Sequence, residues 1–319
     1  MADDLVGKAH SPVGAARDGS DREEPRTMPS PRVTVIISTY NRSEVLRCAV
    51  ASVLAQTMAD FELLVVGDGC TDDSEQVVLG AKDPRVRWIN LPVNTGHQSG
   101  PNNRGLQEAR GEFVAYLGHD DLWLQHHLQC LIETLDASGA AIGHSLLMSV
   151  APGKEVGSPV LPLAGVGSAP SCTMYRREVT EKIGGWGTYR NLNLPPEIDL
   201  FRRAQAAGFE AVFVPRLTVV KFPALHRKDV YRGRPFHEQA LWLERIRSDP
   251  SLESTCLVHM IRADEVTRAL PARKLARILL QQLKERIFWR LNRRSGQRAI
   301  FWTAKGSGID LQKKYKGID

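Results

Sequence analysis

The residues of this sequence best suited to chemistry are two adjacent carboxylates, Asp120 and Asp121, near the end of residues 111–123. They follow residues 113–117, an apolar run of β-formers with a glycine on either side, which predicts a short buried strand. Open α/β sheets bind ligands beyond the carboxyl ends of their strands. Magnesium sites combine one or two carboxylates with substrate phosphates. The pattern therefore predicts a metal–diphosphate site.

A helix cap is the alternative interpretation of the same pair. Asp121 precedes the apolar residues 122–124, and an aspartate at that place would accept hydrogen bonds from the first backbone N–H groups of a helix. This interpretation predicts a helix over residues 122–136. The surrounding elements decide between the two.

Strands and helices alternate before the carboxylate pair, with Ser43 expected to cap the first helix. Alternation of this kind predicts an α/β fold with a mainly parallel central sheet and crossover helices. The predicted strands are 33–38, 61–66, 86–90 and 113–117, and the predicted helices are 43–55, 74–80 and 99–110.

Three segments, in this order and spacing, resemble the signature of family 2 glycosyltransferases. They read Ile-Ser-Thr-Tyr-Asn-Arg at 37–42, Val-Gly-Asp-Gly-Cys-Thr-Asp-Asp at 66–73, and Ala-Arg-Gly-Glu at 109–112 continued by the carboxylate pair. The resemblance covers about residues 31–225. It implies a GT-A-like, Rossmann-type sandwich that binds a nucleoside-diphosphate sugar, with a UDP-sugar favoured. It also implies a divalent metal (Mn or Mg), usually an inverting reaction, and no nucleic-acid partner.

The resemblance also implies roles for single residues. Tyr40 would lie against the base and Asp68 would accept a hydrogen bond from an N–H of that base. Asp121 would be the direct metal ligand, and His226 in a C-terminal basic loop a further one, although a solvated histidine is the alternative there. The donor-binding residues would be Ser38, Tyr40, Arg42, Asp68 and Asp120, with Asp120 close to both ribose and metal.

The second half of the resemblance includes a candidate catalytic base. In the segment Pro195-Pro-Glu-Ile-Asp199, Glu197 takes the place of the family's base and Asp199 would orient its neighbours. An inverting transfer needs one carboxylate to accept the proton of the attacking hydroxyl. The alternative is that Pro196 and Glu197 only open a helix, since both residue types favour a first turn.

Four residues depart from the family pattern: Gly67, Asn102, His119 and Pro196. They leave both metal-site aspartates in place. Gly67, Asn102 and Pro196 also keep open a second hypothesis, a non-catalytic sugar-nucleotide-binding protein of the same fold.

Composition sets the expected organisation of the 319 residues. We expect a disordered tail over 1–30, and a glycosyltransferase domain over 31–235 with a nucleotide-sugar half (31–121) and an acceptor half (122–235). A helical C-terminal extension (236–305) and a loose tail (306–319) would follow. The chain has no run of 18 apolar residues and no apolar segment at its start, and its five cysteines do not have zinc-site spacing, so we expect a cytoplasmic protein with reduced thiols.

The net charge of +6 is modest, so the position of the positive residues along the chain is more informative than their number. Residues 271–292 are predicted to form a basic amphipathic helix. It would either lie on the inner face of an anionic membrane, near a lipid-linked acceptor, or pack on its own domain or a second subunit of a homo-oligomer; packing is the commoner case. The acceptor would be a glycan, a lipid-linked sugar or a small molecule. Residues 151–170 are predicted to form a loop that closes over substrate.

Overall fold

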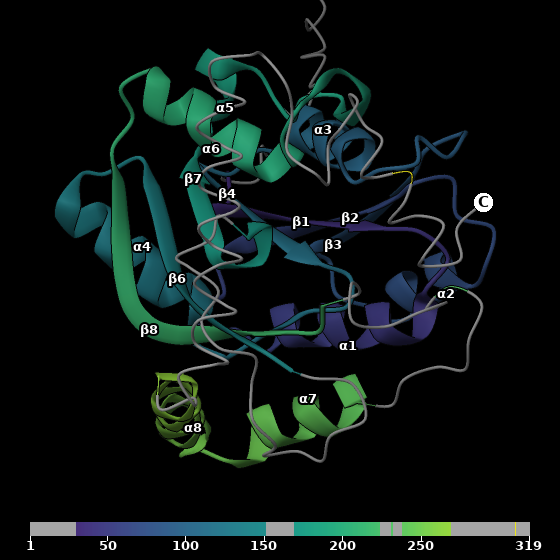
Figure 1. Cartoon of the computed structure of the whole chain (residues 1–319). Coiled ribbons are helices and arrows are strands. Elements are labelled where there is room, and N and C mark those ends of the chain that lie inside the picture. The colour runs from purple at the N-terminus through teal and green to yellow at the C-terminus, as the bar shows by residue number, and fades with distance from the viewer. Residues whose placement is uncertain (1–29, 151–168, 224–230, 232–237, 269–309, 311–319) are drawn as a thin grey trace, which may run out of the picture.

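The computed structural model describes residues 30–150, 169–223, 231, 238–268 and 310. Within these residues an eight-stranded sheet lies at the centre, in the order β3-β2-β1-β4-β7-β6-β8-β5. Helices cover both faces of the sheet (Figure 1). The predicted α/β class is therefore observed.

The first half of the sheet is parallel throughout. β1 is the central strand of this half, and its Val33 is in register with Phe61 of β2 and Phe113 of β4. Strands β1, β2 and β4 read as almost continuous apolar runs because helices bury both of their faces, whereas the edge strand β3 is partly exposed. These strands are β1 (Val33–Thr39), β2 (Phe61–Gly67), β3 (Val86–Asn90) and β4 (Phe113–Gly118).

The second half of the sheet mixes directions. β7 runs antiparallel to both β4 and β6, whereas β6 and β8 are parallel. β5 is a two-residue strand that pairs antiparallel with the end of β8. The bounds are β5 (Leu122–Trp123), β6 (Ile142–Ser149), β7 (Thr173–Arg176) and β8 (Ala211–Lys221).

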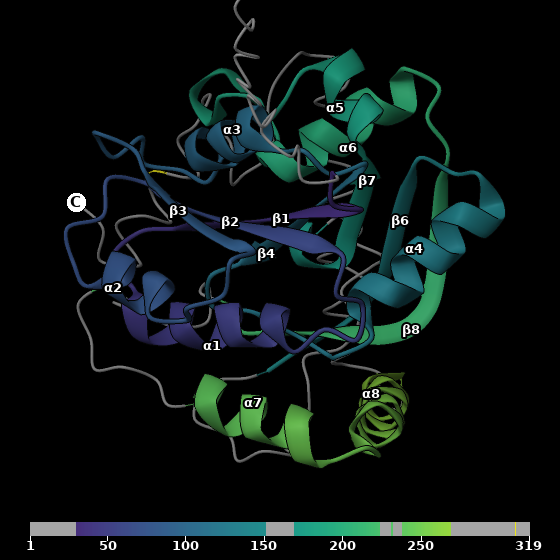
Figure 2. The same cartoon turned by 180° about the vertical axis from the view of Figure 1, so that it is seen from behind.

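The helices divide between the two faces as the alternation of side chains requires. Val33, Val35 and Ile37 of β1 point into a core with α1 (Ser43–Leu54), α2 (Ser74–Leu79) and α4 (His127–Ser138). Ile36 points the opposite way. Its core includes residues of α3 (Ser99–Glu108), α5 (Arg177–Ile183) and α6 (Pro196–Ala206), and Figure 2 shows the same two layers from behind. The 3₁₀ turns are Pro170–Cys172 and Tyr189–Asn191.

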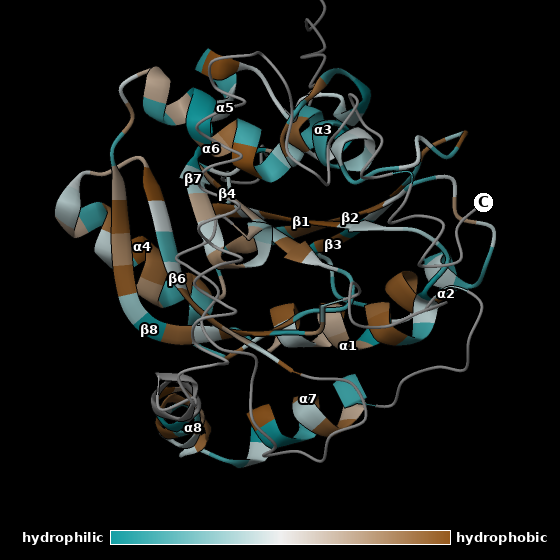
Figure 3. Ribbon diagram, in the orientation of Figure 1, coloured by the Kyte–Doolittle hydropathy of each residue, from teal (hydrophilic) through white to brown (hydrophobic). Residues whose placement is uncertain are grey.

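The helices α7 (Glu238–Ser248) and α8 (Leu252–Arg268) lie within the predicted helical extension over 236–305. Their apolar residues Trp242, Ile246 and Met260 share one core with β5, β6 and β8. In Figure 3 the brown segments of both helices alternate with hydrophilic ones. The described part of the C-terminal extension is thus built onto the sheet domain.

Three local predictions were wrong. Residues 122–126 are not helical, because Leu122 and Trp123 pair with Val220 and Val219 of β8, and the helix begins only at His127. The cap interpretation of Asp121 fails with them. Ser43 is the first helical residue rather than its cap, and its backbone N–H donates to Asp72 instead.

The long strand β8 contains a proline, Pro215. Its pairing with β6 skips from Val214 to Leu217. This bulge accommodates Pro215, which has no N–H for the ladder.

Several predictions lie outside the described residues: most of the tail over 1–30, nearly all of the loop over 151–170, His226, the helix over 271–292, and nearly all of the tail over 306–319. In the part of the chain that is described, no helix is both long and apolar enough to span a bilayer. All five cysteines are described, and none forms a disulfide.

Candidate active site

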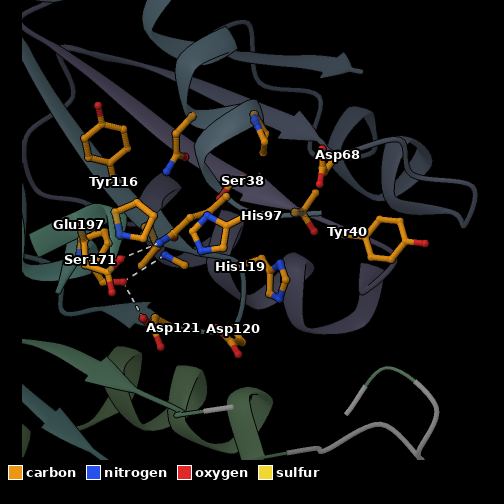
Figure 4. A pocket seen from close by; sticks show the side chains of 18 of the residues that line it. Ser38, Tyr40, Asp68, His97, Tyr116, His119, Asp120, Asp121, Ser171 and Glu197 are labelled. Atoms are coloured by element: carbon orange, nitrogen blue, oxygen red, sulfur yellow. Dashed lines mark hydrogen bonds between the residues drawn. The ribbon is translucent and has the colours of Figure 1, made fainter. Parts of the chain in front are cut away.

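The carboxyl ends of β1, β2, β4 and β8 surround a cavity of about 490 Å³. Pockets of this size hold small ligands. Tyr40 and Asp68 lie on one side of the cavity, Glu197 and Tyr116 on the other, and Asp120 between them (Figure 4). Of the residues predicted for the site, the cavity brings together Ser38, Tyr40, Asp68, Asp120, Asp121 and Glu197.

Asp68 follows β2 directly and holds the next loop. Its Oδ1 accepts from the backbone N–H of Thr95 at 2.8 Å and from the Thr95 hydroxyl at 2.7 Å, while Oδ2 accepts from the N–H of Gly96 at 3.0 Å. The side chain is only 5% exposed. Because Oδ2 accepts one of these bonds and Oδ1 two, Oδ2 is the oxygen with capacity for a ligand N–H.

The departure from the family pattern at Gly67 has a steric reason. A Cβ at this residue would lie 2.5 Å from Asn90 Oδ1 and 2.8 Å from the Trp88 ring. Asn90 in turn bonds both the N–H and the carbonyl of Cys70, each at 2.9 Å. The β3 side chains therefore occupy the space that an aspartate would need, and Asn90 organises the loop after β2.

Asp121 is fully buried and engaged on both oxygens. Oδ2 accepts from the Ser171 hydroxyl at 2.6 Å and pairs with Lys221 Nζ at 2.9 Å, and Oδ1 accepts from the N–H of Phe222 at 3.0 Å. A metal bound to Asp121 would share the carboxylate with these three donors, since Oδ1 accepts one bond and Oδ2 two. The role of Asp121 as the direct metal ligand stays a prediction.

Asp120 is the more accessible of the two carboxylates, since its side chain is 18% exposed and lines the cavity. Arg42 lies behind it, with Nη1 3.5 Å from Asp120 Oδ2 and its guanidinium 5.4 Å from the centre of the Tyr231 ring. Arg42 itself does not line the cavity. Its link to a ligand is through Asp120 and Tyr231.

The described side chains could hold a divalent metal only if a bound ligand supplied further oxygen atoms to it. Across the ranges that the structure describes, no three His, Cys, Asp or Glu side chains are grouped so that they could hold a metal. Magnesium-type sites, however, need only one or two carboxylates when phosphate oxygens complete the shell. Asp120, with Asp121 beside it, meets that lower requirement.

Glu197 lies in the first turn of α6 and lines the cavity. Gln98, at the start of α3, donates to its Oε2 at 3.3 Å. Glu197 therefore opens a helix and also lines the cavity, and its role as a base stays a prediction. It is positioned to exchange a proton with a ligand there.

Asp199 does not line the cavity but holds a neighbouring turn. Its Oδ2 accepts from Arg203 Nε at 2.7 Å, and Arg203 donates to the carbonyls of Ile183 at 2.7 Å and Gly185 at 2.6 Å. Asn103 of α3 fixes the next residue, Trp186, through its backbone N–H and carbonyl. Asp199 thus supports the turn beside the cavity through Arg203, and its part in a reaction stays a prediction.

Sequence reasoning missed four residues of the site: Gln98, Ser171, Lys221 and Tyr231. Lys221 had a signal, because it is a charged residue directly after the apolar strand residues 217–220. Although burial disfavours its charge, the carboxylates of Asp121 and Asp120 raise the pKa of Lys221 above its ordinary value. It is therefore a permanent cation. Burial raises the pKa of Tyr231, so its phenol stays neutral.

Comparison with known proteins agrees with this arrangement. Residues 34–184 match the family model described as Glycosyl transferase family 2. An uncharacterized glycosyltransferase of Nostoc sp. is 33% identical over 171 residues, which are 48% of this chain and 53% of that protein. A GalNAc(5)-diNAcBac-PP-undecaprenol beta-1,3-glucosyltransferase of Campylobacter jejuni is 36% identical over 108 residues, 32% of this chain and 34% of that protein. The chain thus spans from a third to half of the length of these relatives.

Solved structures show the same fold. TarS of S. aureus in complex with UDP-GlcNAc aligns with a TM-score of 0.53 at 18% identity, over 68% of this chain and 67% of that one. The mannosyltransferase PcManGT of Pyrobaculum calidifontis, in complex with GDP-Man and Mn²⁺, aligns with a TM-score of 0.50 at 17% identity, over 90% and 87%. These neighbours confirm the GT-A-like fold.

Proposed function

Because this chain belongs to glycosyltransferase family 2 through residues 34–184, we propose that it transfers a sugar from a nucleoside-diphosphate sugar to an acceptor hydroxyl. The observation that best supports this proposal is that Glu197 lines the same cavity as Asp120, Asp68 and Tyr40. A proton acceptor and a nucleotide-type site thus share one space. UDP-sugars are the favoured donors, and cell-envelope polysaccharide, another glycan or a natural product is the acceptor class.

The donor half of the proposal assigns the nucleotide to the ends of β1 and β2. Tyr40 supplies an aromatic face for the base, Asp68 Oδ2 an acceptor for a base N–H, and Ser38 a hydroxyl beside them. The names of similar proteins support a nucleotide sugar, since TarS was captured with UDP-GlcNAc and PcManGT with GDP-Man.

The chemical step assigned to Glu197 is an inverting displacement. The acceptor oxygen bonds to the anomeric carbon, the bond from that carbon to the β-phosphate oxygen breaks, and the acceptor proton passes to Glu197. The diphosphate leaves with the electron pair, so no covalent enzyme intermediate forms. A carboxylate positioned this way contributes about 10²- to 10⁴-fold to the rate.

Asp120 is the residue we assign to a divalent metal, Mn or Mg, with Asp121 behind it. When bound there, the metal would neutralise the charge that grows on the leaving diphosphate. The Mn²⁺ in the PcManGT complex supports this assignment.

The test is turnover on a panel of nucleotide sugars. Purified protein is incubated with UDP-, GDP-, CDP- and dTDP-sugars and Mn²⁺, and release of the nucleoside diphosphate is measured with and without acceptor extracts. We expect release from one nucleotide class, and its loss in Asp120→Asn. No release from any donor, with nucleotide binding intact, would favour the non-catalytic sugar-nucleotide-binding protein instead.

A further inference from the structure

Lys221 is a cation in the site to which no role has yet been assigned. It ends β8, and the pairing of Val220 with Leu122 sets it beside Asp121. Its Nζ lies 2.9 Å from Asp121 Oδ2. The side chain is 31% exposed and is among those that line the cavity.

The ammonium of Lys221 has donors to spare. It carries three N–H groups, and within the described residues only the Asp121 carboxylate accepts from one of them. Asp121 is itself fixed by Ser171 and by the N–H of Phe222. The ammonium is therefore held in a fixed position with two N–H groups available to a ligand. A residue that only neutralised Asp121 would not need these two donors.

The charge of the cavity makes this cation significant. Carboxylates outnumber lysine and arginine four to one among the described residues that line it: Asp68, Asp120, Asp121 and Glu197 against Lys221. Arg42 pairs with Asp120 from behind, so among the described lining residues Lys221 is the lysine or arginine that can meet the oxygens of a diphosphate directly. Hydrogen bonds between charged groups are about twice as strong as neutral ones.

We propose that Lys221 donates hydrogen bonds to the diphosphate of the bound nucleotide, and that Asp121 positions its ammonium rather than binding metal directly. The inference rests on the proposed function, since it names a further contact for the same donor. As the glycosidic bond breaks, negative charge grows on the β-phosphate, and a fixed ammonium stabilises that charge without reorganising. Lys221 would act beside a metal at Asp120.

The test separates the diphosphate contact from the rest of nucleotide binding. Affinities for UDP and uridine, and for GDP and guanosine, are measured by calorimetry in EDTA, so that no metal contributes. The key variant is the charge-neutral pair Asp121→Asn with Lys221→Met. Its Asn can still accept from the N–H of Phe222 and contact Ser171, and replacing both members of a buried pair is often tolerated. Lys182→Met, an exposed lysine on α5, is the matched control.

We expect the wild-type protein to bind one diphosphate more tightly than its nucleoside. The double variant should lose about ten- to a hundredfold of that advantage, the value of a hydrogen bond to a charged group. Nucleoside affinity should not change, and Lys182→Met should behave as wild type. Lys221→Gln, whose amide can still donate to Asp121, should show the same loss and serves if the double variant does not fold.

Two results would overturn the inference. If the uncharged variants keep the full diphosphate advantage, Lys221 is only a counter-ion for Asp121, and the proposed function is untouched. If the wild-type protein binds neither diphosphate nor nucleoside, even with Mn²⁺ added, the proposed function fails together with the inference.

Discussion

The two ends of the central strands both carry charged side chains, but in opposite balance. At the amino ends, three carboxylates (Glu62, Glu112 and Asp136) pair with four arginines (Arg110, Arg87, Arg32 and Arg176). At the carboxyl ends, the described residues that line the cavity include four carboxylates and one lysine, and no arginine.

This difference distinguishes structural charge from functional charge. The amino-end network is complete within the protein: Glu62, for example, accepts from Thr34 at 2.8 Å and from Arg110 Nη2 at 2.7 Å. At the carboxyl ends, the carboxylates of the described lining residues face a cavity, where a metal and cationic groups would meet a diphosphate. Breaking the first should therefore cost stability, and breaking the second should cost activity.

The largest effect is expected at Glu197. The change Glu197→Gln removes the proton acceptor while keeping the shape, so turnover should fall by about 10²- to 10⁴-fold. Nucleotide binding and the unfolding midpoint should stay near wild type. The measurement is donor turnover at saturating nucleotide sugar.

Asp199→Asn is the matched control for that change, because Asp199 lies two residues away and only supports Arg203. Its effect on turnover should stay below about tenfold, in keeping with the modest value of a partly exposed ion pair. A reversed order of the two variants would place the base at Asp199.

A smaller effect, of a different kind, is expected at the amino ends. Glu62→Ala leaves the buried hydroxyl of Thr34 without this acceptor and should lower the free energy of unfolding by about 2 kcal/mol. Turnover at 25 °C should not change. Urea unfolding and donor turnover are measured on the same preparation, with the exposed Glu181→Ala as control. If Glu62→Ala lost turnover without losing stability, the distinction between structural charge at the amino ends and functional charge at the carboxyl ends would be wrong.

The smallest effect is expected at His127, beneath the site. This residue stacks on Trp123 at 4.1 Å and bonds the Thr218 hydroxyl at 2.7 Å, and Trp123 donates to the carbonyl of Ser171. Burial lowers the pKa of His127 well below its ordinary value of 6.5. The unfolded chain therefore binds a proton that the folded protein excludes, so stability is lost as pH falls below about 6.5.

His127→Asn keeps a polar partner for Thr218 and cannot titrate. Its free energy of unfolding should fall less steeply between pH 6.5 and 5, by up to about 1.4 kcal/mol per pH unit. Urea unfolding at several pH values measures the two slopes. Equal slopes would show that His127 does not contribute to the acid sensitivity of the site.

The parallel half of the fold was predictable because its signals are local. Each strand from β1 to β4 is an apolar run within one short segment, and the candidate residues Tyr40, Asp68 and Asp120 come just after the runs end. Their convergence follows from the parallel order alone.

The mixed half was less predictable because its contacts are distant in sequence. The two residues of β5 are a strand only through pairing with β8, about 97 positions later. Asp121 and Lys221 meet across 100 positions, so the sequence alone could not show which aspartate of the pair is already occupied. Glu197 was identifiable through resemblance, whereas Gln98 beside it was not.

The most direct measurement is a thermal-shift panel of UDP, GDP, CDP and dTDP, each with and without Mn²⁺. A ligand that binds only the folded protein must raise its apparent stability, by about 2.7 kcal/mol at a hundred times its dissociation constant. The excess of carboxylates at the strand ends predicts a shift with one nucleotide that grows with Mn²⁺, and loss of that metal dependence in Asp120→Asn. No shift with any nucleotide, or a metal-dependent shift that survives in Asp120→Asn, would contradict the account.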